Sequence, residues 1–313
     1  MFQKFLNIFK KKEIYDEEFF RNLPVKDYPK YIKEIYKERT GKNLNLENPR
    51  TIAEKIQWLK LYDNLPIKTV LTDKLLVKDW VAKQTDKLLI PKVYGVWDSF
   101  DEIDFKSLPN RFMLKTNHGC QMNMAIHDNS SYNEQAAALA KATFDKWMKT
   151  NFAYSYGFEL QYKNIVPKIF AEELQEVESE KNRPYPEYKI MCFNGKAKFI
   201  EQLIFISIRE FKRSTHSINW EVEEFSHNDL PVYEKELPRP KNLELMVEIA
   251  EKLAKDFKFV RVDIREVNGE LYFGELTFTP CSGHMTYFPD KYNLIIGDML
   301  DLDIKNNPKI IHC

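Results

Sequence analysis

The strongest constraint on the fold is a predicted β-hairpin near the C-terminal end, VRVDIREVNGELYFGELTF at residues 260–278. Side chains alternate between the two faces of a strand, so the length of the connecting loop decides which residues share a face. A two-residue turn made by the Asn-Gly pair would point Asp263 and Glu275 to opposite faces. A three-residue loop over 267–269, with Gly269 in the left-handed conformation, puts both acids on one face. The pattern predicts this longer loop because it leaves a clean apolar set on the other face: Val260, Val262, Ile264, Tyr272, Leu276 and Phe278.

Two carboxylates on one face repel each other unless a cation lies between them. One interpretation is a Mg²⁺ site, because this ion takes oxygen ligands and binds one or two carboxylates together with substrate phosphates. The alternative is a network of ion pairs with Arg261 and Arg265 on the same strand. From the hairpin alone the ion-pair network is the commoner arrangement. Both interpretations of Asp263 and Glu275 stay open at this point.

The composition excludes several classes of protein. The chain has 313 residues, 43% of them hydrophobic, which is enough for a core and for two or three lobes. Lys+Arg and Asp+Glu both number 47, so there is no basic excess of the kind that a generic nucleic-acid binder shows. The scattered cysteines predict reduced thiols in a cytosolic protein, because Cys120, Cys192, Cys281 and Cys313 form no C-x-x-C pair. No apolar run approaches the roughly 20 residues of a membrane span.

The first twelve residues, MFQKFLNIFKKK, predict a short helix with one apolar face and a basic end. One interpretation is a helix that lies on an anionic membrane surface and gives peripheral contact at the inner face. The other is a terminal helix that packs on the body of the protein. Amphipathicity does not separate the two, and the packed helix is the commoner case.

The remaining pattern mixes helices with strands. Most of residues 1–83 is expected to be helical, with a capping-box signature at Thr51 and Glu54. A strongly periodic helix is expected within 243–257, and a second hairpin around the Asn-Gly pair at 194–195. Further expected elements are strands in 88–97, 111–119 and 164–177 and a helix over 133–152 capped by Asn133. This mixture predicts an α+β fold with antiparallel sheets. Neither common Gly-rich nucleotide motif is present.

Some polar residues at the ends of predicted elements suit phosphate binding. Lys115 ends the strand-like run FMLK just before a loop, and Lys74 lies at the start of a helix. Phosphates need cations and backbone N–H groups, and both positions could supply them. Glu172 follows the strand-like run IFA and could face a nucleotide base. A solvated lysine or a plain strand end is the common alternative for each residue taken singly.

Together these parts resemble the ATP-grasp superfamily, and within it the TupA-like branch found with bacterial cell-surface polysaccharide synthesis. Sequences of this branch often carry a glycosyltransferase name, against which the ATP-grasp elements argue. The resemblance covers about residues 48–300. The stretches that carry it are NPRTIAEKIQWLKLYD, TDKLLVKDWV, IPKVYGVWDSFDEIDFKSLPNRFMLKTNHG, PEYKIMCFNGKAKFIEQ, KRSTHSINW and FKFVRVDIREVNGELYFGELTF.

The resemblance implies two α+β lobes with antiparallel sheets that hold ATP between them. We therefore expect a helical N-terminal region over 1–87, a small lobe or lid over 88–163, and a C-terminal lobe over 164–313 that carries the metal site. Closure of the small lobe would exclude water from a reactive intermediate.

The resemblance also implies roles for single residues. Lys74 and Lys115 would contact the phosphates of ATP, and Asp263 and Glu275 would hold Mg²⁺. Thr277 stands where many members of the superfamily have Asn, so a second ion would be held less firmly. Lys115 and Arg213 are the expected catalytic residues. The expected ATP-binding set is completed by His118, Gly119, Lys189 and a hinge for adenine formed by Glu172, Glu173, Leu174 and Gln175.

The loop after Lys115 departs from the branch. It reads NHGCQMN where the branch commonly has N-H-G-S-G-G-N, so two glycines are lost. Glycines let a loop approach phosphates closely, and their loss either stiffens the loop, re-aims it or impairs turnover. His118 and His284 each have two open interpretations, a contact with phosphate or substrate and a hydrogen-bonded structural role. Cys120 and Cys281 are expected to be packed thiols near the site.

The expected function is an ATP-dependent carboxylate–amine ligase that forms an amide through an acyl phosphate. By the setting of the branch, the acid would be a sugar uronate or an acidic polymer of capsule, O-antigen or cell-wall polysaccharide, and the acceptor an amine. The alternatives are a sugar-modifying transferase or kinase on the same fold, and a non-catalytic ATP-binding module. The expected location is cytoplasmic. The sequence names neither substrate.

Overall fold

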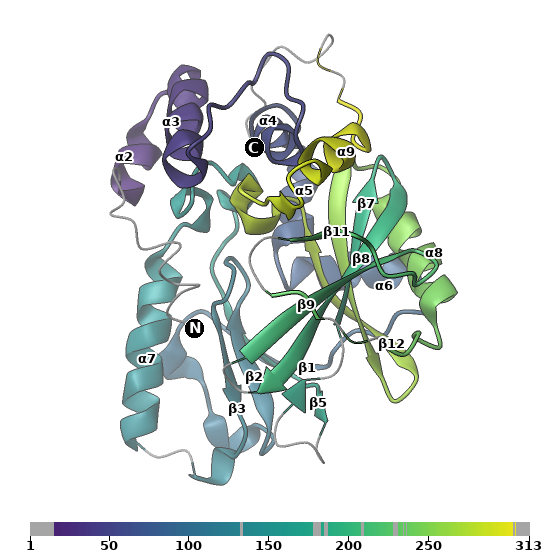
Figure 1. The fold of residues 1–313 in the computed structure, drawn as a ribbon. Helices are drawn as coiled ribbons and strands as arrows, with labels where there is room; N and C mark the ends of the chain where they lie inside the picture. The colour runs from purple at the N-terminus through teal and green to yellow at the C-terminus, as the bar shows by residue number, and fades with distance from the viewer. Residues whose placement is uncertain are drawn as a thin grey trace.

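The computed structural model describes residues 16–131, 134–177, 183–184, 187–207, 210–227, 231–233, 235, 237–302 and 304. Within them the two larger antiparallel sheets lie side by side, with the first helices of the chain at one end of the molecule (Figure 1). The expected α+β fold with antiparallel sheets is thereby confirmed. The amphipathic segment 1–12 and Asn133, the expected cap of the helix that follows it, lie outside the described residues.

Most of the described N-terminal region is helical, as expected, but residues 41–51 form an irregular connection between two of its helices. Thr51 accepts a hydrogen bond from the backbone N–H of Glu54, and the Glu54 carboxylate accepts one from the backbone N–H of Thr51, which confirms the predicted capping box. The elements in this region are α2 (Glu17–Asn22), η1 (Val25–Asp27), α3 (Tyr28–Thr40), α4 (Ile52–Tyr62), α5 (Pro66–Thr72) and α6 (Leu76–Gln84).

A four-stranded sheet forms the smaller lobe, in the order β1-β4-β2-β3. Its strands are β1 (Val93–Trp97), β2 (Phe112–Thr116), β3 (Asn123–Ile126) and β4 (Ile169–Glu172), and helix α7 (Glu134–Lys149) packs against it (Figure 1). Phe112, Leu114 and Phe144 lie in the core between the sheet and α7. Strand β4 lies beyond residue 163 in the chain but pairs with β1 and β2, so this sheet extends past the expected end of the lid.

A five-stranded sheet forms the larger lobe, in the order β12-β11-β7-β8-β9. Its strands are β7 (Glu187–Phe193), β8 (Lys196–Ser207), β9 (Glu210–Ser217), β11 (Phe259–Val267) and β12 (Glu270–Thr277). Helix α8 (Leu243–Ala254) covers one face, as its periodicity predicted (Figure 1). The β7–β8 hairpin turns at Asn194 and Gly195, with φ of 47° and 76°, which confirms the second expected hairpin.

The second face of the five-stranded sheet changes character along its strands. At one end Met191, Phe193 and Phe259 join a core that also contains residues of α3 and α4. Further along the same face, β7 and β11 carry charged residues instead, among them Lys189 and Asp263. The sheet therefore uses one end of this face for packing and the other end for a polar site.

The remaining described elements are short. They connect the lobes or cap their ends: η2 (Phe100–Glu102), η3 (Phe105–Ser107), η4 (Asn129–Ser131), η5 (Phe152–Tyr154), η6 (Leu160–Tyr162), β5 (Glu176–Val177), β6 (Arg183–Pro184), β10 (Ser226–His227), η7 (Pro280–Gly283), β13 (Tyr287–Phe288) and α9 (Tyr292–Asp298).

The hairpin of β11 and β12 corrects one prediction. Val267 pairs with Glu270, so the turn has two residues and not three, and both Asn268 and Gly269 have positive φ, as such a turn requires. The register then shifts, because one extra residue, Gly274, is inserted between the partners of Ile264 and Asp263. Asp263 consequently pairs with Glu275, as predicted. The apolar face differs from the prediction, because it carries the buried Leu271 and Phe273 and not Tyr272, which pairs with Arg265. A β-bulge, and not the loop, brings the two acids together.

Candidate functional site

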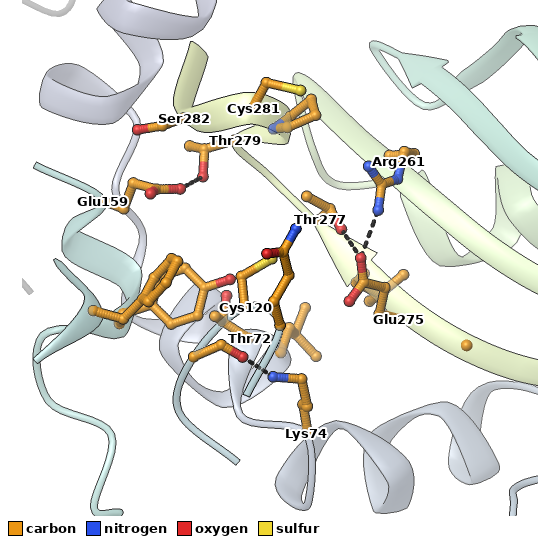
Figure 2. Close-up of a pocket in the computed structure, with 18 of the residues that line it drawn as sticks. Thr72, Lys74, Cys120, Glu159, Arg261, Glu275, Thr277, Thr279, Cys281 and Ser282 are labelled. Carbon is orange, nitrogen blue, oxygen red and sulfur yellow. Dashed lines mark hydrogen bonds and ion pairs between the residues drawn. The ribbon is translucent and has the colours of Figure 1, made fainter. Parts of the chain in front are cut away.

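A pocket of about 280 Å³ lies between the two lobes. Its walls come from the start of α6, the loop after β2, the segment 152–162, and strands of the five-stranded sheet with the turn that follows β12. Figure 2 shows Arg261 and Glu275 on one side of this pocket and Glu159 on the other. The charged side chains that line it are Lys74, Glu159, Lys189, Arg213, Arg261 and Glu275.

The two acids of the hairpin are held by cations. The Arg261 guanidinium donates to both oxygens of Asp263, at 2.6 and 2.7 Å, and to Oε1 of Glu275 at 2.5 Å. Lys189 donates to Oδ2 of Asp263 at 2.6 Å. Asp263 is fully buried, whereas 41% of the Glu275 side chain is exposed. The pair therefore presents one carboxylate to the pocket and keeps the other behind it.

These contacts form the ion-pair network that the sequence left open as the alternative to a Mg²⁺ site. It differs from that alternative in one of its cations. Arg261 bridges the acids as that alternative requires, but Arg265 binds Glu187, with nitrogen–oxygen distances of 2.7 and 2.9 Å. Lys189 takes the remaining place beside Asp263 and also binds Glu187 at 2.7 Å. The sequence did not single out Glu187.

The two acids titrate in opposite directions. Complete burial raises the pKa of Asp263, and the neighbouring Glu275 and Glu187 raise it further, against Arg261 and Lys189. Burial also opposes ionisation of Glu275, but Arg261, Lys189 and Lys74 outweigh it and lower the pKa of this carboxyl. Such a split is the expected behaviour of two carboxylates that share a site.

The hairpin supplies oxygen ligands of the kind that Mg²⁺ prefers. Asp263 and Glu275 are paired across the strands, and the Thr277 hydroxyl donates to Oε1 of Glu275 at 2.8 Å. In the described part of the chain, no three His, Cys, Asp or Glu side chains converge as a metal site. The set therefore fits an ion that takes its other ligands from a nucleotide and water, provided that Arg261 gives up its place between the acids.

A second charged cluster lies in the smaller lobe, at the end of β4. The Glu172 carboxylate binds Lys78 at 2.8 Å and contacts Lys115 as well. Burial opposes its ionisation, but the two lysines lower the pKa of Glu172 to about 2. Glu172 thus faces cations in this structure and not an open space for a base. Lys78, which the sequence analysis missed, is one helical turn after Lys74 on the same helix-forming segment.

Lys74 is positioned where the two lobes meet. Asp73 accepts hydrogen bonds from the backbone N–H groups of Leu75 and Leu76, at 2.8 and 3.2 Å, and so orders the turn between α5 and α6. The backbone N–H of Lys74 donates to the carbonyl of Asn117 at 3.1 Å, and its ammonium contacts the carbonyl of Gly119. Burial lowers the pKa of Lys74, although Glu275 opposes this. The lysine thus lies between the β2 loop and the acids of the hairpin.

The altered loop after β2 is well packed in the structure. Gln121 has a φ of 59°, so the left-handed conformation persists at a position where the branch has glycine. Met122 is buried and lies so close to Gly119 that a Cβ there would be 2.4 Å from its sulfur. Cys120 and Cys281 line the pocket and are exposed, so the expectation of packed thiols is wrong. Desolvation by the surrounding residues raises the pKa of Cys120 to about 11, so this thiol is a poor nucleophile.

The two histidines have different surroundings. His118 is buried, with Nε2 3.0 Å from the carbonyl of Trp147 and Nδ1 3.3 Å from Oδ1 of Asn117, which favours the structural interpretation. His284 stacks on Tyr36 with ring centroids 6.1 Å apart, and both of its ring nitrogens are buried without a hydrogen-bond partner among the described residues. Neither histidine lines the pocket.

The other expected site residues divide between the pocket and its surroundings. Lys74, Gly119, Lys189, Arg213, Glu275 and Thr277 line it, whereas Lys115, His118, Glu172 and Asp263 are not among its lining residues. Arg213 on β9 binds Glu201 on β8 at 2.5 Å. In the expected hinge, the Glu173 N–H donates to the Lys92 carbonyl at 2.9 Å, Leu174 is half-buried, and Gln175 is buried 3.4 Å from Arg265. The adenine-binding role of this hinge stays a prediction.

The sequence analysis missed one side of the pocket. Glu159 lines it from the segment between α7 and β4, together with Phe152, Tyr156 and Tyr162. This segment has no long periodic pattern, since it is built of the short helices η5 and η6. The available signal was its composition, four aromatic residues and one acid within FAYSYGFEL.

The comparisons with known proteins agree with this architecture. Two α+β lobes with antiparallel sheets and N-terminal helices are, in this chain, the ATP-grasp fold of the family whose sequence profile it matches. The sequence profile of the TupA-like ATP-grasp family matches residues 54–301. This protein therefore belongs to the TupA-like ATP-grasp family. Among curated proteins, none matches the sequence.

Solved structures similar to this chain include two ATP-grasp ligases. PsnB, complexed with a minimal precursor, has 10% identity and a TM-score of 0.41, with 75% of this chain and 61% of PsnB covered. D-alanine–D-alanine ligase from Bacillus anthracis has 13% identity and a TM-score of 0.42, with 79% and 67% covered. ATP-grasp relatives bind ATP and Mg²⁺: PsnB also forms a complex with Mg and ADP, and the Bacillus anthracis ligase one with ATP.

The helices offer no route across a bilayer within the described residues. None of them combines the length and the apolar character that a membrane span requires.

Proposed function

We propose that this protein is an ATP-dependent carboxylate–amine ligase that forms an amide through an acyl phosphate. One observation carries the proposal: four cations and one exposed carboxylate line a single pocket between two ATP-grasp lobes. Phosphates and carboxylates are the groups that such cations bind. The pocket is suited to an anionic nucleotide and an anionic acid side by side.

The charge balance around the pocket favours a nucleotide with Mg²⁺. On the hairpin side, Arg261, Lys189 and Arg265 are matched by the three carboxylates that they bind. On the other side, Lys78 of α6 and Lys115 of β2 share the carboxylate of Glu172, and Lys74 adds a further positive charge. The excess of positive charge on this side would complement a nucleotide triphosphate that carries a divalent cation.

Asp263 and Glu275, with Thr277 beside them, are the residues that would hold Mg²⁺. When bound there, the ion would neutralise charge on the transferring phosphoryl group. The cationic side chains of the pocket would bind and orient the phosphates of ATP. Lys74 and Lys115 would bind phosphate oxygens, and Arg261, released from the acids, would reach the same region of the pocket.

In the proposed reaction an oxygen of the acid attacks the γ-phosphorus of ATP, and ADP leaves. The acyl phosphate that forms is then attacked by an amine, which gives an amide and phosphate. Arg213 lines the pocket from β9 and is suited to orient the carboxylate of the acid. No nucleophilic Ser or Cys is required, because the protein contributes orientation and electrostatic stabilisation.

The substrate class and the location are part of the proposal. The resemblance to the TupA-like branch favours a uronic-acid sugar or another acidic polymer of cell-surface polysaccharide synthesis. ATP chemistry and thiols without disulfides at Cys120, Cys192 and Cys281 favour the cytoplasm.

The test is ADP release, screened over uronate sugars and amino compounds, with mass analysis of the products. Asp263→Asn and Glu275→Gln should lose turnover by at least about a hundredfold while the fold remains intact. Glu270→Gln is the matched control, because Glu270 is exposed at the tip of the same hairpin, and it should keep wild-type rates. Wild-type rates in both site variants would remove the metal assignment.

A second candidate, a non-catalytic ATP-binding module, is favoured by two observations. Arg261 occupies the space between the acids, and the loop after β2 carries Gln121 and Met122 where the branch has glycines. Binding of ATP–Mg²⁺ without ADP release, for every acid and amine pair tested, would favour this candidate. A phosphorylated or glycosylated product would instead point to a kinase or a transferase.

A further inference from the structure

The pocket has a second end that the ATP-binding residues do not use. We name it the acid end, because its charged lining residue is a carboxylate and its other lining residues are aromatic or neutral. Figure 2 shows Glu159, Thr279 and Ser282 together here, across the pocket from Glu275. The lining residues of the acid end are Phe152, Tyr156, Glu159, Tyr162, Thr279 and Ser282.

Glu159 is held firmly at this end. Only 4% of the residue is exposed, and its Oε1 accepts a hydrogen bond from the Thr279 hydroxyl at 2.5 Å. Gln161 in turn donates to the Thr279 hydroxyl at 2.8 Å. A buried carboxylate is costly unless it is paired, and one that also lines a pocket is a candidate for a binding role.

The charges around Glu159 leave its carboxylate as the group that faces the pocket. Lys60 is buried behind the wall and donates to the carbonyl and hydroxyl oxygens of Ser282, both at 3.1 Å. Arg39 lies over the ring of Tyr156, 5.5 Å from its centroid. Both cations favour the charged form of Glu159, but neither lines the pocket.

The walls of the acid end are aromatic. The ring of Phe152 lies 4.8 Å from that of Tyr162 and 5.6 Å from that of Tyr156, measured between centroids. Aromatic faces attract cations, and a carboxylate among them binds an ammonium group by charge-assisted hydrogen bonds. A second anion, by contrast, would meet repulsion from Glu159.

We propose that Glu159 binds the ammonium group of the acceptor, so that the acceptor is a primary amine whose carbon skeleton packs on Phe152, Tyr156 and Tyr162. This inference rests on the proposed ligase function and names the class of its second substrate. It also separates the two substrates in space, with the acid and nucleotide at the cationic side and the amine at the acid end.

The same carboxylate is placed to take a proton. An ammonium ion must lose one proton before it attacks, and Glu159 accepts it as an N–H bond breaks and an O–H bond forms. The nitrogen lone pair then forms the C–N bond, while the bond from the acyl carbon to the phosphate oxygen breaks and its electrons leave with phosphate. The second nitrogen proton departs with that phosphate. Burial raises the pKa of Glu159, against Lys60, which makes the carboxylate a better base.

The first experiment measures binding to the protein saturated with ADP and Mg²⁺, by titration calorimetry. The probes are ethanolamine, alaninamide and serinol, each beside its hydroxyl analogue: ethylene glycol, lactamide and glycerol. Wild type should bind at least one amine about tenfold or more tightly than its analogue. Glu159→Gln should remove this preference. If no amine binds more tightly than its analogue, or if the preference survives Glu159→Gln, the inference is wrong.

A second variant protects the test against misfolding, because Glu159→Gln leaves the buried Lys60 without its counter-charge. Lys60→Met combined with Glu159→Gln removes both charges, and this double variant should bind ADP normally but show no preference for amines. Glu248→Gln is the matched control, since Glu248 is exposed on α8, and it should keep the preference. A preference retained in the double variant overturns the inference.

The inference and the proposed function fail in distinguishable ways. ADP release with acid alone should continue in Glu159→Gln, because the first half of the reaction does not involve the amine, whereas the KM for amine should rise. If no acid supports ADP release but the amine preference depends on Glu159, the ligase function fails and the amine site remains. If ADP release depends on an acid but no amine is preferred, the ligase function stands and the amine site is wrong.

Discussion

Two buried carboxylates, Glu172 in the smaller lobe and Asp263 in the larger, have similar partners but opposite behaviour. Each is bound by two cations, Glu172 by Lys78 and Lys115 and Asp263 by Arg261 and Lys189. The pKa of Glu172 is lowered to about 2, whereas that of Asp263 is raised. Burial acts to raise the pKa of both carboxyls, so burial alone does not explain why their net pKa shifts are opposite.

The difference lies in the neighbouring acids. Glu275 and Glu187 repel the charge on Asp263, whereas the largest effects on Glu172 come from burial and from its two lysine partners. The lesson is that cation partners alone do not distinguish a structural ion pair from a ligand site. Crowded carboxylates, by contrast, leave a site that still favours added positive charge. On this comparison we propose that Glu172 serves mainly stability and that Asp263 serves mainly ligand binding.

The largest expected effect tests the structural side. Glu172→Gln should lower the free energy of unfolding by about 3–5 kcal/mol, because the buried Lys78 and the half-buried Lys115 lose their counter-charge. Denaturant unfolding with a fixed m-value measures this. Glu248→Gln, an exposed acid, should change the free energy of unfolding by no more than about 0.5 kcal/mol. A loss at Glu172 as small as that of the control would break the comparison.

The stability difference between wild type and Glu172→Gln should also depend on pH, by an amount similar to the loss just predicted. A pKa lowered from 4.5 to about 2 contributes stability that is present above pH 4.5 and is lost as the pH falls through about 2. The difference between wild type and Glu172→Gln should therefore shrink by about 3 kcal/mol over this window. For Asp263→Asn, the corresponding difference should not shrink on acidification, because the pKa of Asp263 is raised. Parallel curves for the two variants would contradict this prediction.

A smaller loss of stability is expected for Asp263→Asn, about 1–3 kcal/mol. Arg261 keeps Glu275 as a partner and Lys189 keeps Glu187, so neither cation is left unpaired. Binding of ADP should nevertheless lose its dependence on Mg²⁺, which calorimetry with and without the ion would show. A loss of stability larger than that of Glu172→Gln would reverse the assignment of the two sites.

The smallest expected effect concerns the bulge. A Cβ added at Gly274 would lie 2.8 Å from the carbonyl oxygen of Asp263, so Gly274→Ala should lower the free energy of unfolding by about 1–2 kcal/mol and weaken Mg²⁺-dependent binding of ADP. Gly41→Ala is the control, since a Cβ there meets nothing within 4 Å and only its φ of 72° is strained. Unchanged Mg²⁺-dependent binding of ADP in Gly274→Ala would show that the pairing of Asp263 with Glu275 tolerates the added methyl group.

The sequence predicted the fold class well because the main signals are local. The capping box at Thr51 and Glu54 and the turn at Asn194-Gly195 are set by neighbouring residues. In the hairpin, the apolar pattern correctly required the two acids to share a face, but a three-residue loop was the wrong means. The bulge at Gly274 was missed because alternation by itself does not show where an extra residue lies in a strand.

The site could be predicted only where a residue ends a recognisable element. Lys74 and Lys115 were found in that way. Lys78 and Glu159 were missed, because their roles depend on contacts with residues 94 and 120 positions away in the chain. Arg261 was considered only as a partner for the acids, and its place in the pocket follows from the register of β11 against β12.

The position of the extra residue in β12 has a consequence for how this hairpin can vary. The pairing of Asp263 with Glu275 is set by the bulge at Gly274, which lies next to Glu275 and five residues from the turn residue Gly269. If the turn residues Asn268 and Gly269 were replaced by the turn sequence of another family member, Asp263 and Glu275 should therefore remain paired. The turn of this hairpin can therefore diverge in sequence, while the strand register at the two acids is fixed by the bulge.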